Sequence, residues 1–439
     1  MNILALAADV PATSRMPGSP RLFNFCRELS KRHAISLMAI CRSEERRKLF
    51  LDDHSARGVF REITFLAGPC SPAWWNKQSH RLHLAPHFIT KYRYPEYYGS
   101  IRSIINKKLE ENQSVDVVYV ADLPMTQYVG RHQEIPSIVD LGDCKTLLFE
   151  RTTRMEKRLL RKLALYLETR SVSRWERALG QSFGLVIMTS SVDESCMKKL
   201  APFTATLAIT NGVDSNYFSA SKESGNSGQL IFTGVMNYRP NEDAVLYFCK
   251  EMFPLIKREY PSVEFWVVGQ NPSSTVQALS QQPGIHVTGT VEDIRPYLEA
   301  AAIFICPLRY GAGIKNKILV AMAMQKPVVA TSISLDGIEA QAGRDVLVAD
   351  SPADFAAKVV RLLRDGGLAR RLGENGHRLV VERYSWKARA EVLEAAVQRV
   401  VAYKKAFVDR SMGRGSQVQD PISGRVLLER GTIQSEEAN

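Results

Sequence analysis

The chain has 439 residues, of which 45% are hydrophobic and 24% are charged, and it carries a formal net charge of +12. This length suits two or three domains, and this composition excludes a chain that is too polar to bury large cores. The positive charge favours a negatively charged partner, such as a nucleotide, a phosphate, a nucleic acid or an anionic lipid surface, without choosing among them.

The chain shows no sign of a disulfide framework, a zinc site or a targeting segment. Its seven cysteines form no C-x-x-C pair and are accompanied by no histidine cluster, so we expect reduced thiols in the cytoplasm. The start, MNILALAADVP, lacks the basic lead of a signal peptide and is better explained as a first buried strand. No run of about 18 apolar residues occurs, so we expect no transmembrane helix.

Short apolar runs alternate with helix-length segments in both halves of the chain. Runs of this length that are rich in Val and Ile predict parallel strands with crossover helices. Two such sets predict an α/β protein with two doubly wound, Rossmann-like domains. The expected strands are 3–8, 33–40, 62–67, 116–121, 137–142 and 185–190 in the first half, and 229–234, 264–269, 285–290, 302–308 and 327–332 in the second.

The first strand is followed by the loop PATSRMPGSPRLFNF (11–25), in which Gly18 is flanked by two prolines. Glycine permits an unusual backbone path, and the prolines favour a helix that begins near Arg21. The backbone amides at such a helix start suit an anion or a sugar hydroxyl.

The segment 151–179 departs from the sheet pattern because its apolar residues recur at helical spacing. Between 151 and 177 it carries nine Lys or Arg residues against three Glu residues, which is about half of the net charge. Two interpretations stay open. One is a solvated helix face, and the other is a surface that contacts anionic lipid or a lipid-phosphate acceptor.

The first strand of the second half leads into the loop FTGVMNYRPNEDAVLYF (232–248). The strand ends at Gly234, and we expect the next helix to begin at Asn241 or Glu242. Asn237 and Arg239 can donate to a phosphate or a sugar. No G-x-G-x-x-G fingerprint follows any expected strand, which disfavours a nicotinamide-dependent dehydrogenase.

The stretch PLRYGAGIKNKILVAMA (307–323) joins an expected strand to an expected helix. Gly311 and Gly313 let the backbone approach a ligand closely. Lys315 lies where the first turn of the helix is expected, where a lysine is unfavourable for the helix dipole unless an anion is bound there. Together these features predict a phosphate site, to which Arg309 and Lys317 add positive potential.

The next loop, SISLDGIEAQAGRDVLVAD (332–350), offers acceptors for sugar hydroxyls. Gly337 permits a sharp turn after Asp336, and Glu339 follows it. Plain turn and cap residues explain the same pattern equally well.

The chain as a whole divides into four parts. We expect an acceptor-side domain over 1–207, a second, nucleotide-sugar-binding domain over 208–385, a helix over 386–407 that crosses back to the first domain, and a flexible tail over 408–439.

The motifs, taken in order, resemble those of GT-B-fold glycosyltransferases of the family-4 kind, in the bacterial exopolysaccharide branch. The resemblance covers about residues 1–405. It is carried by NGVDSNYF (211–218), FTGVMNYRPNEDAVLYF (232–248), PLRYGAGIKNKILVAMAMQKPVVAT (307–331) and ERYSW (382–386), with support from DLGD (140–143) and RWERAL (174–179).

The resemblance implies two Rossmann-like domains that face a cleft, with the nucleotide-sugar donor held by the second and the acceptor by the first. It implies sugar transfer with retention of configuration, without a metal ion and without a cofactor. By motif, Gly234 and Arg239 line the donor's diphosphate or base, Gly313 and Lys315 take its phosphates, and Gly18 lies in the loop that closes over it.

The sequence departs from the family pattern at three places. Valine stands at 320, where the family has a glutamate that accepts hydrogen bonds from the ribose hydroxyls, and Tyr310 replaces an acidic residue before the first glycine. The loop after the strand 116–121 lacks the histidine of many relatives and offers Asp122 as its polar group. Residues Asp336 and Glu339 or backbone groups replace the missing ribose acceptor, or the protein binds its donor poorly.

We therefore predict a retaining glycosyltransferase of exopolysaccharide biosynthesis that uses a nucleotide-diphosphate sugar and a lipid-linked or polysaccharide acceptor. In this prediction Lys315 and Arg239 stabilise the charge that grows on the leaving diphosphate. Gly234, Asn237, Gly311, Gly313, Asp336, Gly337 and Glu339 bind the donor, and Gly18, Arg21 and Asp122 lie on the acceptor side.

Two alternatives remain: a catalytically weak or silent partner protein in a polysaccharide-assembly complex, and a nucleotide-sugar epimerase. Peripheral contact with an anionic membrane through 151–177, at the inner face, is one of the two open interpretations of that segment. We expect no nucleic-acid partner, because no nucleic-acid-binding motif occurs.

Overall fold

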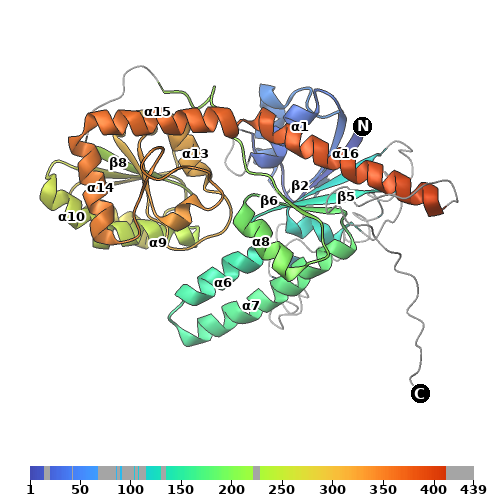
Figure 1. The fold of residues 1–439 in the computed structure, drawn as a ribbon, viewed down its shortest axis with the longest axis horizontal. Helices are drawn as coiled ribbons and strands as arrows, with labels where there is room; N and C mark the ends of the chain where they lie inside the picture. Colours follow the sequence, from blue (N-terminus) through green and yellow to red (C-terminus); the bar gives the residue numbers. More distant parts are fainter. Residues whose placement is uncertain are drawn as a thin grey trace.

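A computed structural model describes residues 1–13, 20–41, 43–67, 86, 89–90, 103, 107, 115–129, 135–220 and 228–411. It contains two parallel sheets with helices around them (Figure 1). This arrangement confirms the predicted fold class of two doubly wound α/β domains. The predicted loop glycine Gly18 and the tail from 412 to 439 lie outside the described residues.

The first sheet has seven strands in the order β3-β2-β1-β4-β5-β6-β7, all of them parallel to their neighbours. The chain turns back between β1 and β4, which is the switch point of a doubly wound sheet. The strands are β1 (Asn2–Ala7), β2 (Ala34–Cys41), β3 (Glu62–Ala67), β4 (Val117–Ala121), β5 (Ser137–Gly142), β6 (Leu185–Met188) and β7 (Thr206–Ala208).

The second sheet has six parallel strands in the order β10-β9-β8-β11-β12-β13, with its switch point between β8 and β11. The short strands β7 and β13 are additions to those predicted from the sequence. The strands are β8 (Gln229–Thr233), β9 (Glu264–Val268), β10 (Ile285–Gly289), β11 (Ile303–Cys306), β12 (Val328–Ala330) and β13 (Leu347–Val348).

Helices follow the strands as crossover connections. Those in the described part of the first domain are α1 (Arg21–Leu29), α2 (Glu44–Asp52), α6 (Lys145–Met155), α7 (Leu159–Ala178) and α8 (Ser191–Leu200). In the second they are α9 (Arg239–Tyr247), α10 (Phe253–Glu259), α11 (Ser274–Gln277), α12 (Arg295–Ala300), α13 (Asn316–Ala323), α14 (Pro352–Arg364) and α15 (Gly366–Arg383).

The last helix, α16 (Trp386–Ser411), returns to the first domain and lies against α1 (Figure 1). Its apolar residues, from Trp386 to Val401, join the core formed by β1, β2 and α1. The second domain has a separate core between its own sheet and helices. Each domain therefore has its own hydrophobic core, and connecting segments join the two domains. Helix α16 continues to Ser411.

Three helix boundaries differ from those expected. The basic segment forms two helices, α6 and α7, because the Glu156 carboxylate accepts a hydrogen bond from the Arg158 amide at 3.1 Å and holds an extended break between them. Helix α9 begins at Arg239, since Pro240 is tolerated in a first turn. Lys315 lies just before α13 rather than within its first turn.

The described helices include none that is both long enough and apolar enough to cross a bilayer. The six cysteines in the described ranges are free thiols.

Candidate active site between the two domains

The loop between β11 and α13 lies at the carboxyl end of a strand beside the switch point, where doubly wound sheets bind ligands. Gly311 and Gly313 have φ angles of +149° and +70°, and the second of these lies in the left-handed region that favours glycine. The Lys315 side chain is 8% exposed, and its ammonium donates to the carbonyls of Ala312, at 3.3 Å, and of Gly313. The loop therefore wraps around the ammonium group of Lys315.

The first domain contacts this loop directly. The Gly313 amide donates to Asp193 Oδ2 at 3.0 Å, and the Ile314 amide donates to Thr189 Oγ1 at 3.4 Å. Both partners are buried and lie at the carboxyl end of β6 and the start of α8. The two amides belong to the loop that leads into α13, and amides at and before a helix start are donors that bind phosphate groups. Here a carboxylate and a hydroxyl of the facing domain accept from them, so an anion in this place must compete with the first domain.

Two effects on the pKa of Lys315 oppose each other. Burial lowers the pKa of the Lys315 ammonium, and the carboxylates of Asp336, Asp143 and Asp193 act in the opposite direction. Asp143 and Asp193 belong to the first domain, so the ammonium lies at the interface between the domains rather than on an outer face. This is the position that a charge-stabilising group between two domains requires.

A second lysine of α13, Lys317, contacts the end of β8 and the first turn of α9. Its ammonium donates to Asn241 Oδ1 at 2.6 Å and lies 4.0 Å from the centre of the Phe232 ring. A side chain at Gly234 would lie within 2.8 Å of this ammonium, so glycine is needed there for the approach. Within the described part of the chain, no carboxylate pairs with Lys317, and burial lowers its pKa to about 8.

We expect diphosphate binding to become weaker as the pH rises above about 8. A bound anion favours the charged form of Lys317, so binding takes up a proton once the free lysine is neutral, and affinity falls by up to about tenfold per pH unit. Because the pKa of Lys317 is lower in the folded chain than in the unfolded chain, the free energy of unfolding rises with pH between about 8 and the ordinary lysine value of 10.5. Calorimetric titration with inorganic diphosphate between pH 7 and 10 measures the slope. An equal slope in Lys317→Met would contradict the assignment.

The loop after β12 is also held by the first domain. Arg151 of α6 donates to the Asp336 carboxylate at 2.7 Å and to the Gly311 carbonyl. A side chain at Gly337, which has φ +80°, would come within 2.5 Å of Ser190 Cβ. Asp336 is therefore engaged by an arginine, which competes with the predicted role of binding a ribose.

On the acceptor side, Arg21 is the centre of a buried polar chain. Its Nε donates to Asp140 at 2.8 Å, and the Tyr119 hydroxyl donates to the same carboxylate at 2.7 Å. Its Nη1 donates to Asn211, whose amide in turn donates to Asn316 Oδ1 at 2.8 Å. The chain thus connects the first sheet to the first residue of α13. The remaining nitrogen, Arg21 Nη2, is buried and has no hydrogen-bond partner among the described residues.

Asp122 follows β4 and has φ 73° and ψ 150°. Backbone strain in this part of φ/ψ space costs a non-glycine residue of order 1–3 kcal/mol. Its carboxylate accepts from the Leu123 amide at 2.8 Å. The pKa of nearby Lys145 is raised: burial acts to lower it, but Asp143 and Asp122 outweigh that effect. Strained backbone beside paired charges is common at functional sites, which favours a role for this cluster at the acceptor end.

Several predicted residues are not brought to the Lys315 loop. Arg239 lies 3.5 Å from Glu156 of the α6–α7 connection, and the Glu339 carboxylate pairs with Arg383 at 2.5 Å. Asn237 is exposed on the loop after β8. Val320 lies on α13, partly buried against the core of the second domain.

Sequence reasoning did not single out the first-domain side chains that face the Lys315 loop. Each follows β5 or β6, at the same sheet edge as Asp122, so the rule that ligands bind at carboxyl ends of strands could have identified them. Asp143, Thr189 and Asp193 lie at this loop, Ser190 lies at Gly337, and Lys145 lies near Asp143.

Known proteins share this fold and part of this sequence. Residues 227–365 match the family described as Glycosyl transferases group 1. An uncharacterized 44.6 kDa protein in the cps region of Klebsiella pneumoniae is 22% identical over 166 residues, which cover 36% of this chain and 43% of that protein. The chain spans less than half of the length of the curated relatives that it matches.

Two solved structures are similar over nearly the whole chain. Sucrose-phosphate synthase from Thermosynechococcus elongatus has a TM-score of 0.67 at 16% identity, covering 92% of this chain and 100% of its own. HepE of Anabaena, solved in complex with UDP and glucose, has a TM-score of 0.60 at 14% identity, covering 91% and 99%. These similarities confirm the GT-B fold.

Proposed function

We propose, from a GT-B fold whose second domain matches the glycosyl transferases group 1 family, that this chain is a retaining glycosyltransferase. It transfers a sugar from a nucleotide-diphosphate sugar to a lipid-linked or polysaccharide acceptor, needs neither a metal ion nor a cofactor, and acts in bacterial exopolysaccharide synthesis. The position in the cps region of one relative and the UDP and glucose bound by one structural neighbour support this choice of pathway and donor.

The observation that carries the proposal is the pair of lysines at the start of α13. Lys315 and Lys317 have lowered pKa values because burial disfavours their charge, and Lys317 has a neutral amide as its hydrogen-bond partner. An anion at this helix start would stabilise both charges and would itself be stabilised by the helix dipole. A diphosphate is the anion that a nucleotide-sugar supplies there.

The mechanism follows from where charge develops. As the bond between sugar and diphosphate breaks, negative charge grows on the leaving phosphate, and preorganised positive groups lower the barrier. In this proposal Lys315, Lys317 and the amides of residues 313 and 314 supply that stabilisation once Asp193 and Thr189 have given up the amides. The departing phosphate oxygen takes the acceptor's proton, so no separate base is required.

On the acceptor side, the strained Asp122, the nearby Lys145 and the Arg21 guanidinium hold the acceptor. They lie at the carboxyl edge of the first sheet, whereas the lysines of α13 belong to the second domain. Transfer then takes place between the two domains. The acceptor hydroxyl and its neighbours are held by the first domain, and the donor is held by the second.

A thermal-shift screen against a panel of nucleotide-sugars tests the proposal. A donor present at 100 times its dissociation constant stabilises the folded chain by about 2.7 kcal/mol. We expect at least one uridine, guanosine or adenosine diphosphate sugar to raise the melting temperature and to be slowly hydrolysed. A panel that neither shifts the melting temperature nor releases sugar would overturn the proposal.

The second candidate is a catalytically silent partner, and Val320 favours it. Valine cannot accept a hydrogen bond from a ribose, and both proposed substitutes, Asp336 and Glu339, are engaged by arginines. We expect Val320→Glu to raise donor affinity about tenfold, because a hydrogen bond to a charged group contributes about 1.5–3 kcal/mol. Val320→Leu is the matched control. Sugar release by the wild-type chain supports the enzyme, and release by the glutamate variant alone supports the silent partner.

A further inference from the structure

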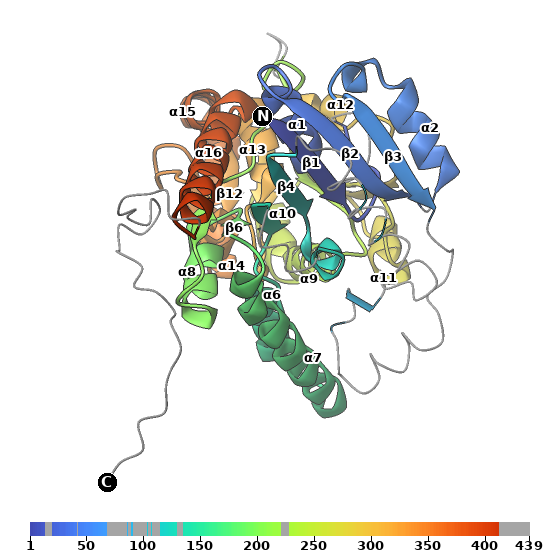
Figure 2. The same ribbon diagram turned by 90° about the vertical axis from the view of Figure 1, so that its right-hand side faces the viewer.

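The helical hairpin formed by α6 and α7 projects from the lower edge of the molecule in Figure 2. Its tip is the connection 156–158 with the first two turns of α7. Every residue from 157 to 164 is exposed, so no side of these two turns is covered by the described part of the chain. A helix start with no buried face gains little stability from its own protein, which indicates that something else covers it.

Large apolar side chains are concentrated on this tip. Leu159 is 82% exposed, Leu160 is 86% exposed and Leu163 is 56% exposed. Single exposed leucines are ordinary, but three within five residues of an uncovered helix form a contiguous apolar surface. Arg158, Arg161 and Lys162 lie around the other side of the same turns.

The apolar surface continues into a cationic one along a single face of α7. Leu163, Leu167, Arg170, Arg174 and Arg177 follow one another at alternating spacings of four and three residues, which places them in one stripe. The stripe is apolar at the tip and cationic toward the body of the protein. With a rise of 1.5 Å per residue, Arg170 lies about 10 Å and Arg177 about 21 Å further along the helix than Leu163.

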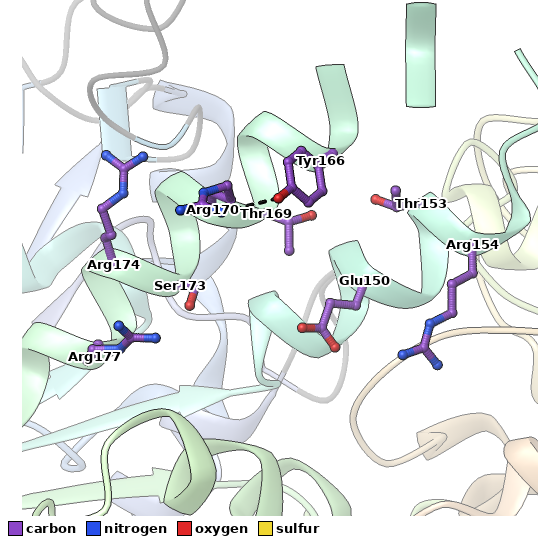
Figure 3. Close-up of a pocket in the computed structure, with 9 residues that line it drawn as sticks. All are labelled: Glu150, Thr153, Arg154, Tyr166, Thr169, Arg170, Ser173, Arg174 and Arg177. Carbon is purple, nitrogen blue, oxygen red and sulfur yellow. Dashed lines mark hydrogen bonds between the residues drawn. The ribbon is translucent and has the colours of Figure 1, made fainter. Parts of the chain in front are cut away.

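The arginines line a groove between the two helices (Figure 3). The groove has a volume of about 460 Å³ and none of its lining residues belongs to the second domain. Arg154, Arg174 and Arg177 form no ion pair with any described residue, and Arg170 is bonded to the Tyr166 hydroxyl at 3.1 Å. One carboxylate, Glu150, is among the lining residues, which are Glu150, Thr153, Arg154, Tyr166, Thr169, Arg170, Ser173, Arg174 and Arg177.

We propose that this hairpin docks on an anionic phospholipid leaflet, with the leucines of the tip in the acyl region and the groove arginines at the phosphates. The order of the stripe, apolar and then cationic, matches the order of a leaflet, in which the phosphates lie outside the hydrocarbon, and Arg170 is the first of these arginines beyond the leucines. Arginine is suited to phosphate because its planar fork donates two hydrogen bonds. The inference deepens the proposed function, since it rests on a lipid-linked acceptor that the enzyme meets at the membrane.

The charge of the hairpin supports a lipid rather than a soluble phosphate. A soluble anion would be bound by the groove alone and would leave the three leucines uncovered. A bilayer covers both surfaces in a single contact. Two ion pairs connect the hairpin to the second domain. Arg151 with Asp336 lies outside both the tip and the arginine groove, and Glu156 pairs with Arg239 where the tip connection begins, before the three leucines.

The test is co-sedimentation of the full chain with vesicles of phosphatidylglycerol and phosphatidylcholine, compared with vesicles of phosphatidylcholine alone. We expect binding to the anionic vesicles at physiological salt. Each arginine near a charged surface contributes about fivefold, so Arg170→Gln, Arg174→Gln and Arg177→Gln together lower the affinity about 100-fold. Leu159→Gln, Leu160→Gln and Leu163→Gln together lower it at least about tenfold.

Matched controls carry the same changes elsewhere. Arg370, Arg371 and Arg378 are exposed on α15, at the opposite edge of the molecule in Figures 1 and 2, and are replaced by glutamine. Leu49 and Leu51, 51% and 46% exposed on α2, are replaced likewise. We expect both controls to bind as the wild-type chain does. Thermal unfolding of every variant confirms that the fold is retained.

Two results would overturn the inference. One is wild-type binding that the groove variant or the tip variant leaves unchanged, and the other is no binding to anionic vesicles at all, which would leave the tip as a contact for a protein. Neither bears on the donor site, because the vesicle assay contains no nucleotide-sugar. A chain that docks on vesicles yet shows no thermal shift with any donor contradicts only the proposed function.

Discussion

Replacing Gly313 with alanine should lower sugar transfer at least about 100-fold while each domain stays folded. A Cβ atom at this position would lie 1.7 Å from Asp143 Oδ1, far inside van der Waals contact, and the residue has φ +70°. Because the colliding atoms are those of the Asp143 carboxylate in the facing domain, the added methyl group displaces that carboxylate from its place near Lys315 and disturbs neither core. A displacement of about 1 Å at reacting groups can cost about 10²-fold in rate.

Gly289 is the matched control for this prediction. It has φ +71°, so alanine there has the same backbone cost, but nothing lies within 4 Å of the added atom. We expect Gly289→Ala to retain nearly full transfer. Asp143→Ala combined with Gly313→Ala removes the colliding oxygen, and the double variant should lose less activity than the sum of the two single changes. Equal loss in both glycine variants would mean that backbone strain, rather than the contact between domains, is responsible.

Lys315→Met should lower kcat by about 10²–10³ and change KM little, because the lost charge acts mainly on the transition state. The ammonium is buried at the interface and is near Asp143 and Asp193 of the other domain. Methionine keeps much of the side-chain stem, so the loop packing that the lysine provides is largely preserved.

Two comparisons make this second prediction specific. Lys250→Met removes an equal charge from a lysine whose side chain is 82% exposed, and it should leave kcat unchanged. Lys315→Arg keeps the charge but carries a larger head group, and it should recover part of the loss. Steady-state turnover measured with the donor found in the thermal-shift screen gives both constants. A kcat for Lys315→Met close to that of the wild-type chain would show that the phosphate is stabilised elsewhere.

Much of the fold could be predicted from local pattern. The buried strands of both domains appear in the sequence as apolar runs, because parallel strands covered on both faces need apolar residues throughout. The glycine loop before α13 could also be predicted, because glycines mark positions of left-handed backbone and the start of a helix can be recognised from neighbouring residues. The observed helix boundaries differ from the predicted ones by a few residues, as at the start of α9 at Arg239. The residues near a helix start, including proline, are compatible with more than one starting position.

The partners of the candidate site residues could not be predicted in this way. Asp336 meets Arg151 and Arg239 meets Glu156, and both contacts join the two domains. The sequence suggested these side chains for a ligand, because the opposing charges that they meet, Arg151 and Glu156, are distant from them along the chain. Val320 differs from these residues, because the absence of a carboxylate at this position can be seen in the sequence alone.

By itself the sequence determined the two α/β sheets, the glycine-and-lysine helix start and the basic segment of the first domain, because each depends on residues that are close together in the chain. Only the tertiary structure decided that first-domain carboxylates face Lys315, that Asp122 is strained beside Lys145, and that the leucines of α7 are left uncovered. These features depend on which surfaces two separately folded domains and one hairpin bring together, and that is set by packing between distant segments.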